Sequence, residues 1–163
     1  ELHHLKPVGR LDKDSTGLII LTNDGEFINE MTHPSIKVPK VYLVQINGKF
    51  TADDAEKMLN GIVIETDSGE KKTAYAETLP IEVNSKSSEI QVVLYQGINR
   101  QIRKMFAKLG FEVKSLKRIQ HATLTLEGLK RGQIKAIKPK QVKELKGYIA
   151  KIKREYAQNS NNG

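Results

Sequence analysis

Near its start the chain reads Gly9-Arg10-Leu11-Asp12-Lys13-Asp14-Ser15-Thr16-Gly17 and then continues into the apolar run Leu18-Ile19-Ile20-Leu21. The two glycines bound a short polar loop, and the apolar run predicts a buried strand directly after it. A loop supported in this way can hold the carboxylate of Asp12 rigidly at the mouth of a cleft, as a nucleophile or general base requires. The same pattern is also typical of a turn closed by an Asx hydrogen bond, which would have no catalytic role.

The rest of the chain predicts an α+β fold with a largely antiparallel sheet, because the expected strands outnumber the helices and mostly form hairpins. The clearest helix carries an apolar stripe at Ile102, Met105, Phe106 and Leu109 and stops at Gly110. We expect strands over residues 18–22, 40–47, 62–65, 73–79, 89–95, 113–116, 123–126 and 133–137, and helices over 26–32, 52–60, 97–109 and 139–156. One domain over 1–156 and a disordered tail over 157–163 complete this prediction.

Composition excludes several classes of protein. The chain of 163 residues has no cysteine, which rules out disulfides and thiolate metal sites, and it has no apolar run of membrane-spanning length. His3 and His4 have no third ligand nearby, so we expect no metal, and no Lys-Ser/Thr phosphate loop follows a strand. We therefore expect a cytoplasmic protein without a membrane partner.

The positive charge is concentrated in the second half of the chain. Residues 1–80 carry 9 Lys/Arg against 13 Asp/Glu, whereas residues 81–163 carry 18 against 6. Such asymmetry is typical of nucleic-acid binding, although a solubilising lysine-rich surface would look the same. In the helix over 97–109, Arg100 and Arg103 could bind phosphates or pair with a carboxylate, whereas Lys104 fits a solvated face. Tyr42 could pack in the core or stack on a base.

Four segments carry a more specific signal: the loop 9–18 with its continuation Leu21–Gly25, Lys40-Val41-Tyr42, Gly97–Met105, and Leu116-Lys117-Arg118. In this order they closely resemble the motifs of bacterial rRNA pseudouridine synthases of the RsuA/RluB/RluE/RluF type. Their catalytic motif, Lys-x-Tyr motif, Gly-x-Asn-Arg-Gln-Ile-Arg-Arg-Met motif and Leu-x-Arg element all have a counterpart here. The resemblance implies the pseudouridine synthase fold, a mixed sheet with flanking helices and a central cleft.

The resemblance also implies roles for individual residues. Asp12 would be catalytic, Tyr42 would stack on the base and handle a proton, and Arg103 would pair with Asp12. Further basic residues would bind RNA: Arg10, Lys40, Arg100, Lys104, Lys117 and Arg118. Two departures stand out: Ala122 occupies a position where the family usually has glycine, and the chain begins almost on the catalytic motif. We therefore expect it to lack the upstream S4-type RNA-binding domain and the first strand of the catalytic domain.

The implied function is the isomerisation of one uridine of a structured rRNA stem-loop to pseudouridine, in large-subunit rRNA rather than small-subunit rRNA. The reaction involves no redox change, so we expect no cofactor and no metal, and we expect a monomer. Two alternatives stay open. A non-catalytic RNA-binding or ribosome-assembly module would explain the charge, and a glycosidic hydrolase would need Asp14 as a second acid beside Asp12.

Overall fold

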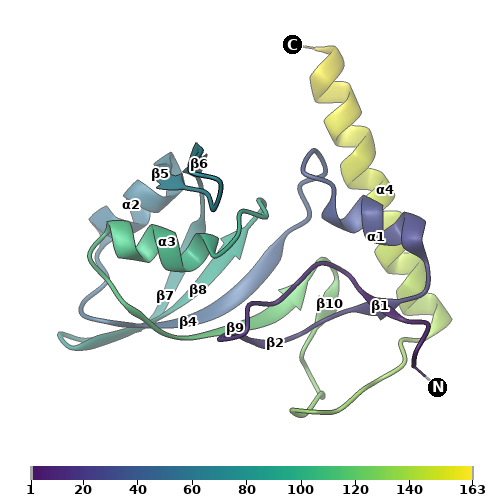
Figure 1. Cartoon of the computed structure of the whole chain (residues 1–163), viewed down its shortest axis with the longest axis horizontal. Helices are drawn as coiled ribbons and strands as arrows, with labels where there is room; N and C mark the ends of the chain where they lie inside the picture. Colours follow the sequence, from purple (N-terminus) through teal and green to yellow (C-terminus); the bar gives the residue numbers. More distant parts are fainter. Residues whose placement is uncertain (1, 163) are drawn as a thin grey trace.

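The computed structural model describes residues 2–162, which are organised around one six-stranded sheet (Figure 1). The main path runs β10-β9-β4-β8-β7, and β2 adds to β9. The strands are β2 (Thr16–Gly17), β4 (Lys40–Asn47), β7 (Glu77–Val83), β8 (Ser87–Leu94), β9 (Val113–His121) and β10 (Leu124–Thr125). All neighbours are antiparallel except β2 and β9, which run parallel. The predicted α+β class with a largely antiparallel mixed sheet is confirmed.

One end of the sheet is covered by helices α2 (Ala52–Asn60) and α3 (Gln101–Lys108) and by the hairpin of β5 (Ile62–Glu65) and β6 (Lys71–Ala74) (Figure 1). The stripe of α3 buries Ile102, Met105 and Phe106 as its spacing predicts. Alternate residues of β8 face the same core, because successive strand side chains point to opposite faces. A capping box between Thr51 and Asp54 fixes the start of α2.

A second core lies at the other end of the sheet, where α1 (Gly25–Thr32) packs beside α4 (Pro139–Asn161) (Figure 1). Phe27 and Met31 of α1 and Leu145 and Ile149 of α4 are its buried centre. The small sheet of β1 (Lys6–Pro7) and β3 (Leu21–Thr22) lies at this end. None of the helices in residues 2–162 combines the length and apolar character needed to cross a bilayer.

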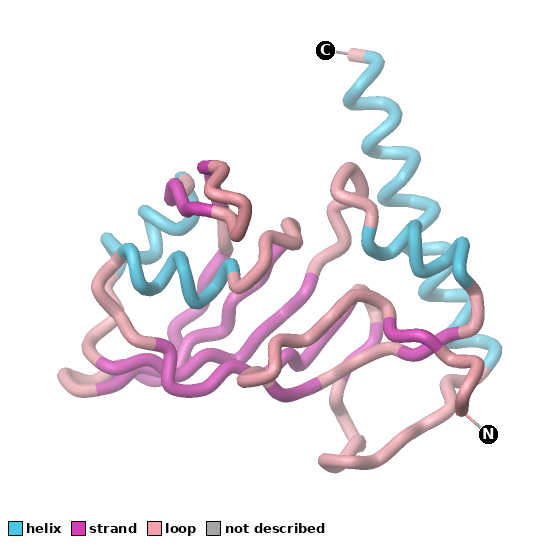
Figure 2. The backbone as a smooth tube through the Cα atoms, in the orientation of Figure 1, coloured by secondary structure: helices cyan, strands magenta, loops and turns pink. Residues whose placement is uncertain are grey.

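Several predicted elements differ from the structure. The strand expected over 73–79 is divided between β6, which ends at Ala74, and β7, which begins at Glu77 in another sheet. The apolar run expected as one strand over 18–22 passes between two sheets: Leu18 donates to Arg118 of β9, whereas Val8 donates to Ile20 beside β1. Residues 133–137 form a loop instead of a strand (Figure 2). They are mostly exposed and have no strand partner among the described residues, so neither burial nor pairing supports a strand there.

The tail that the sequence predicts to be disordered also differs from the structure, because α4 continues to Asn161 instead of ending at 156. No proline or glycine interrupts the chain between Gly147 and Gly163, so nothing in the backbone stops the helix earlier. Ser160 donates its hydroxyl to the carbonyl of Tyr156 within this last stretch. Gly163 lies outside the described residues.

Candidate active site

A cavity of about 240 Å³ lies where the 9–15 loop meets β4, β9 and the start of α3. Six of the residues that the sequence singles out line it: Arg10, Asp12, Lys40, Tyr42, Arg100 and Arg118. The remaining three, Arg103, Lys104 and Lys117, do not. The sheet and the helix therefore bring together segments that are about 100 residues apart in the chain.

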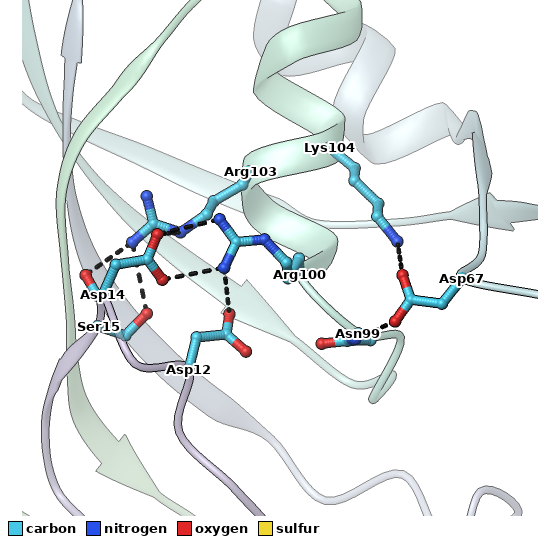
Figure 3. Close-up of polar contacts among 8 residues, drawn as sticks. All are labelled: Asp12, Asp14, Ser15, Asp67, Asn99, Arg100, Arg103 and Lys104. Carbon is cyan, nitrogen blue, oxygen red and sulfur yellow. Dashed lines mark hydrogen bonds and ion pairs between the residues drawn. The ribbon is translucent and has the colours of Figure 1, made fainter.

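The carboxylate of Asp12 belongs to the loop wall of this cavity and is 28% exposed (Figure 3). The turn that holds it is closed by the backbone, since the Ser15 amide donates to the Asp12 carbonyl at 2.9 Å. No hydrogen bond reaches the Asp12 side chain from any described residue, so the carboxylate does not form the Asx turn considered as an alternative. The nearest cation is Arg100, whose Nη1 lies 4.0 Å from Asp12 Oδ2.

Asp14 is the anchor of the loop. Arg100 donates to both of its carboxylate oxygens, at 2.9 and 3.0 Å (Figure 3). This fork-on-carboxylate geometry is the strongest type of side-chain ion pair. The hydrogen bond from Arg100 lowers the pKa of Asp14 to about 2, so the carboxylate is ionised at any neutral pH.

The sequence predicts that Arg103 pairs with Asp12, whereas in the structure Arg103 contacts Asp14. Arg103 lies one helical turn further along α3, and its Nη2 donates to the backbone carbonyl of Asp14 at 2.9 Å (Figure 3). Its Nε lies 3.5 Å from the Asp14 carboxylate. The helix begins at Gln101, not at residue 97, and Arg100 before it adopts a left-handed conformation with φ of 54°. We attribute the position of Arg100 beside Asp12, where Arg103 was expected, to this turn of the backbone.

Replacing Asp14 by asparagine should lower activity on RNA by about 10- to 100-fold, because the freed loop no longer holds Asp12 in place. The folded state should persist, since Asp14 is exposed. Asp53→Asn, which breaks the surface ion pair with Lys57 on α2, is the matched control and should leave the rate unchanged. Equal rates for both variants in a single-turnover assay would show that the Asp14 ion pair does not position the loop.

Tyr42 lies on the sheet wall of the cavity, where it also packs against the core, so both of its predicted environments apply. Burial raises the pKa of Tyr42, an effect that the neighbouring Arg118 partly offsets. The hydroxyl is therefore protonated at neutral pH. Lys40, two residues earlier on β4, is half-buried, and burial together with the charge of Arg118 lowers the pKa of its ammonium group.

The sequence predicts that Arg118 binds RNA, but in the structure this side chain is not available to an RNA backbone at the protein surface. Its side chain is 2% exposed, and its Nε donates to the Leu18 carbonyl at 2.8 Å. Lys104 also differs from a free surface cation, because its Nζ lies 3.2 Å from Asp67 in the β5–β6 hairpin, and the same carboxylate accepts from Asn99 (Figure 3). Arg10 and Lys117 are exposed as expected.

His121, at the end of β9, lines the cavity although the sequence analysis did not select it. It is 1% exposed, and neither ring nitrogen has a hydrogen-bond partner among the described residues. Burial, with the charges of Arg118 and Lys40, lowers its pKa from 6.5 to about 3, so the ring is neutral. The only available signal was its place three residues after the arginine of the Leu-x-Arg element.

Protein stability should fall as the pH is lowered from about 6.5 towards 3, because in this window the unfolded chain protonates His121 and the folded chain does not. The contribution of this one group amounts to about 1.4 kcal/mol per pH unit at most. Urea denaturation between pH 4 and 7 gives the free energy of unfolding of the parent and of His121→Leu, and the difference between them measures the contribution of His121. The free energy of unfolding of His121→Leu should depend less steeply on pH. His33→Leu removes an exposed imidazole and is the control; an unchanged slope in His121→Leu would contradict a neutral buried ring.

Together these features define the catalytic domain of a pseudouridine synthase: a largely antiparallel sheet with a cavity that is lined by a loop carboxylate and a half-buried tyrosine. A solved structure, "Crystal structure of pseudouridylate synthase", superposes with a TM-score of 0.78 at 27% identity over 87% of this chain and 60% of that one. Residues 1–108 match the RNA pseudouridylate synthase family. The chain belongs to this family, as the four motifs predicted.

Similar sequences of known proteins support the same family. The ribosomal large subunit pseudouridine synthase B of Bacillus subtilis (strain 168) is 39% identical over 140 residues, which are 86% of this chain and 57% of that protein. The ribosomal large subunit pseudouridine synthase E of Vibrio parahaemolyticus serotype O3:K6 (strain RIMD 2210633) is 34% identical over 139 residues, which are 79% of this chain and 58% of that protein. The chain therefore spans less than two thirds of the length of these relatives.

Proposed function

We propose that this chain catalyses the isomerisation of a uridine in ribosomal RNA to pseudouridine, with Asp12 as the catalytic carboxylate. The observation that carries the proposal is the Asp12 side chain at the wall of a cavity that Tyr42 also lines, without a hydrogen-bond partner for its carboxylate among residues 2–162. The names of the similar Bacillus and Vibrio proteins favour large-subunit rRNA as the substrate. We expect a structured stem-loop as the target and a monomer as the active species, in the cytoplasm.

The reaction begins with the target uridine leaving its stack and entering the cavity, at a cost that contacts in the cavity offset. Asp12 then either attacks C1′ of the ribose or removes the proton from C2′, and the C1′–N1 bond breaks. The nearest cation to this carboxylate is Arg100, whose Nη1 lies 4.0 Å from Asp12 Oδ2. The detached uracil rotates, C5 bonds to C1′, and the C5 proton leaves, so that no net oxidation occurs and no cofactor or metal is required.

Tyr42 serves in this scheme to hold the flipped base, since an aromatic ring at a cavity wall offers a stacking surface. Its protonated hydroxyl makes it a hydrogen-bond donor in the resting site. For removal of the C5 proton it would need to lose its own proton first, and Arg118 beside it favours that loss.

RNA outside the cavity would be held by exposed cations, among them Arg10 at the cavity mouth and Lys117 on β9. Lys104 could join them by exchanging Asp67 for a phosphate. The excess of basic residues in the second half of the chain supports a phosphate-binding surface, and binding should weaken steeply with added salt.

The hydrolase alternative is disfavoured by the state of Asp14. A general acid must carry a proton at the working pH. The pKa of Asp14 is about 2, and both its oxygens accept from Arg100, so it cannot donate one to a leaving base.

The experiment that tests the function uses rRNA labelled with tritium at uridine C5. A synthase releases tritium and forms pseudouridine in the intact strand without freeing uracil. Free uracil would instead indicate a hydrolase, and retained RNA with neither product would indicate a binding module. Each of these two results would overturn the proposal when full-length rRNA and its fragments are both supplied.

A further inference from the structure

The floor of the cavity carries an unusual cluster of nitrogen-bearing side chains: Lys40 on β4, and Arg118 and His121 on β9. Nη2 of Arg118 and both ring nitrogens of His121 are buried and have no hydrogen-bond partner among residues 2–162. Buried polar atoms are nearly always paired in folded proteins, and an unpaired one calls for a ligand or a role. The three orphaned atoms belong to side chains that are at least 98% buried.

An irregularity in the sheet is what brings these residues together. Strands β4 and β9 lie side by side (Figure 1), and their register pairs Tyr42 with Arg118 and Lys40 with His121. Between the two pairs the register shifts by one residue on β9. Arg118 and His121 are three positions apart and would face opposite sides of a regular strand, but the extra residue turns both towards the cavity.

Space and charge at the floor suit an acceptor ligand. A Cβ atom at Gly97 would lie 3.5 Å from Lys40 Nζ, so the missing side chain leaves room over the ammonium group. No carboxylate among the described residues lies within ion-pair distance of Lys40 or Arg118, and the ion-pair partner of Asp12 is Arg100. The floor is therefore positively charged without a counterion from the described chain.

We propose that Lys40, Arg118 and His121 bind the carbonyl oxygens of the flipped uracil and stabilise the negative charge that the ring acquires when the C1′–N1 bond breaks. This inference rests on the proposed function and assigns these three side chains the role of an oxyanion site. It makes the general prediction of RNA binding by Lys40 and Arg118 specific, with the target base as the group that they contact.

The chemistry balances on either route of Asp12. When C1′–N1 breaks, the bonding pair stays on the uracil and spreads over N1, O2 and O4, where positive charge and N–H donors are most effective. On the first route Asp12 is then bonded to C1′, and on the second it carries the C2′ proton. The C5–C1′ bond forms as the carboxylate leaves or the proton returns, the C5 proton departs to a base, and N1 takes a proton from water.

The first test is Lys40→Met on the whole chain, with labelled rRNA as substrate. We expect kcat to fall by about 100-fold, the typical loss for one oxyanion donor. RNA affinity and its dependence on salt should stay as in the parent. If Lys40 contacts a phosphate instead, binding weakens at every salt concentration and the salt slope drops by about 1, which would overturn the proposal.

Two further variants separate charge from structure. Lys40→Arg keeps the cation and should recover most of the lost rate. Lys114→Met removes an exposed lysine of β9 that pairs with Glu112 at 3.2 Å, and it should keep the rate of the parent. Circular dichroism and urea denaturation show whether each variant is folded. If Lys40→Met does not fold, His121→Gln, which keeps a hydrogen-bond donor and an acceptor, provides a second test.

A change of leaving group gives a readout that a merely structural role would not affect. Fluorine at C5 withdraws electrons and makes the uracil anion more stable, so cleavage of C1′–N1 should depend less on the cationic floor. With 5-fluorouridine rRNA, the ratio of parent to Lys40→Met in single-turnover loss of the nucleoside should be smaller than with uridine rRNA. Equal ratios would overturn the proposal. Failure of the parent itself to act on uridine would instead refute the proposed function.

Discussion

Asp12→Asn should abolish tritium release from labelled rRNA, with a loss of at least about 1,000-fold, the range expected when a group that reacts directly is removed. The amide has nearly the shape of the carboxylate but can neither attack C1′ nor accept the C2′ proton. Because no hydrogen bond from residues 2–162 holds the Asp12 side chain, the substitution should leave the loop and its Asp14 anchor intact.

The measurement is the single-turnover rate at RNA concentrations that saturate both proteins, with binding followed separately by filter retention. Asp53→Asn on α2 is the control, since it makes the same chemical change at an exposed aspartate outside the cavity, whose ion-pair partner is Lys57. A rate for Asp12→Asn within tenfold of the parent would contradict a catalytic role for Asp12. The proposed function could then survive only with another carboxylate, and Asp14, with a pKa of about 2, would be the next to test.

Gly17→Ala should be the most destabilising single substitution in the catalytic loop. An added Cβ would lie 2.2 Å from the carbonyl oxygen of Arg118 and 2.5 Å from its amide nitrogen, which are backbone atoms of β9. The residue also has φ of +112°, a conformation that alanine rarely adopts. We expect the free energy of unfolding to drop by about 3 kcal/mol or more, as strain and overpacking combine.

Urea denaturation of Gly17→Ala beside Gly147→Ala provides the matched comparison. Gly147 lies inside α4 with no neighbouring atom within 4 Å, so the same chemical change should there raise the free energy of unfolding by about 0.5–1 kcal/mol. Opposite signs for the two variants are the expected outcome. Equal midpoints would mean that β2 does not approach β9 as closely as the structure has it.

Local sequence signals predicted the elements that depend on local interactions. The apolar stripe of α3 and the bounds of α2 agree with the prediction, because helix periodicity and capping act within a few residues. The backbone conformation at Ala122 agrees with what the family resemblance implies for this position. Its φ of 55° is left-handed, which gives a physical reason for the glycine that the family usually has there.

Contacts between residues that are far apart in the chain could not be predicted from local sequence patterns. No local pattern pairs Asp14 with its partners Arg100 and Arg103, because they lie 86 and 89 residues away in the chain. Motif resemblance predicts that Arg103 pairs with Asp12, whereas in the structure the arginine 4.0 Å from Asp12 is Arg100, which has a left-handed backbone. The strand over 133–137 failed for a related reason, since a strand needs a partner that no local pattern can supply.

By itself the sequence determined the family, the α+β class, and the carboxylate, tyrosine and cationic segments of the candidate site, because these follow from residue identity and short-range spacing. The tertiary structure alone decided which groups meet. It buried Arg118, which the sequence predicts to bind RNA, and it turned His121 into the cavity through the register shift between β4 and β9. The physical reason is that burial and pairing are set by the sheet register, and a shift of one residue changes which face a side chain occupies.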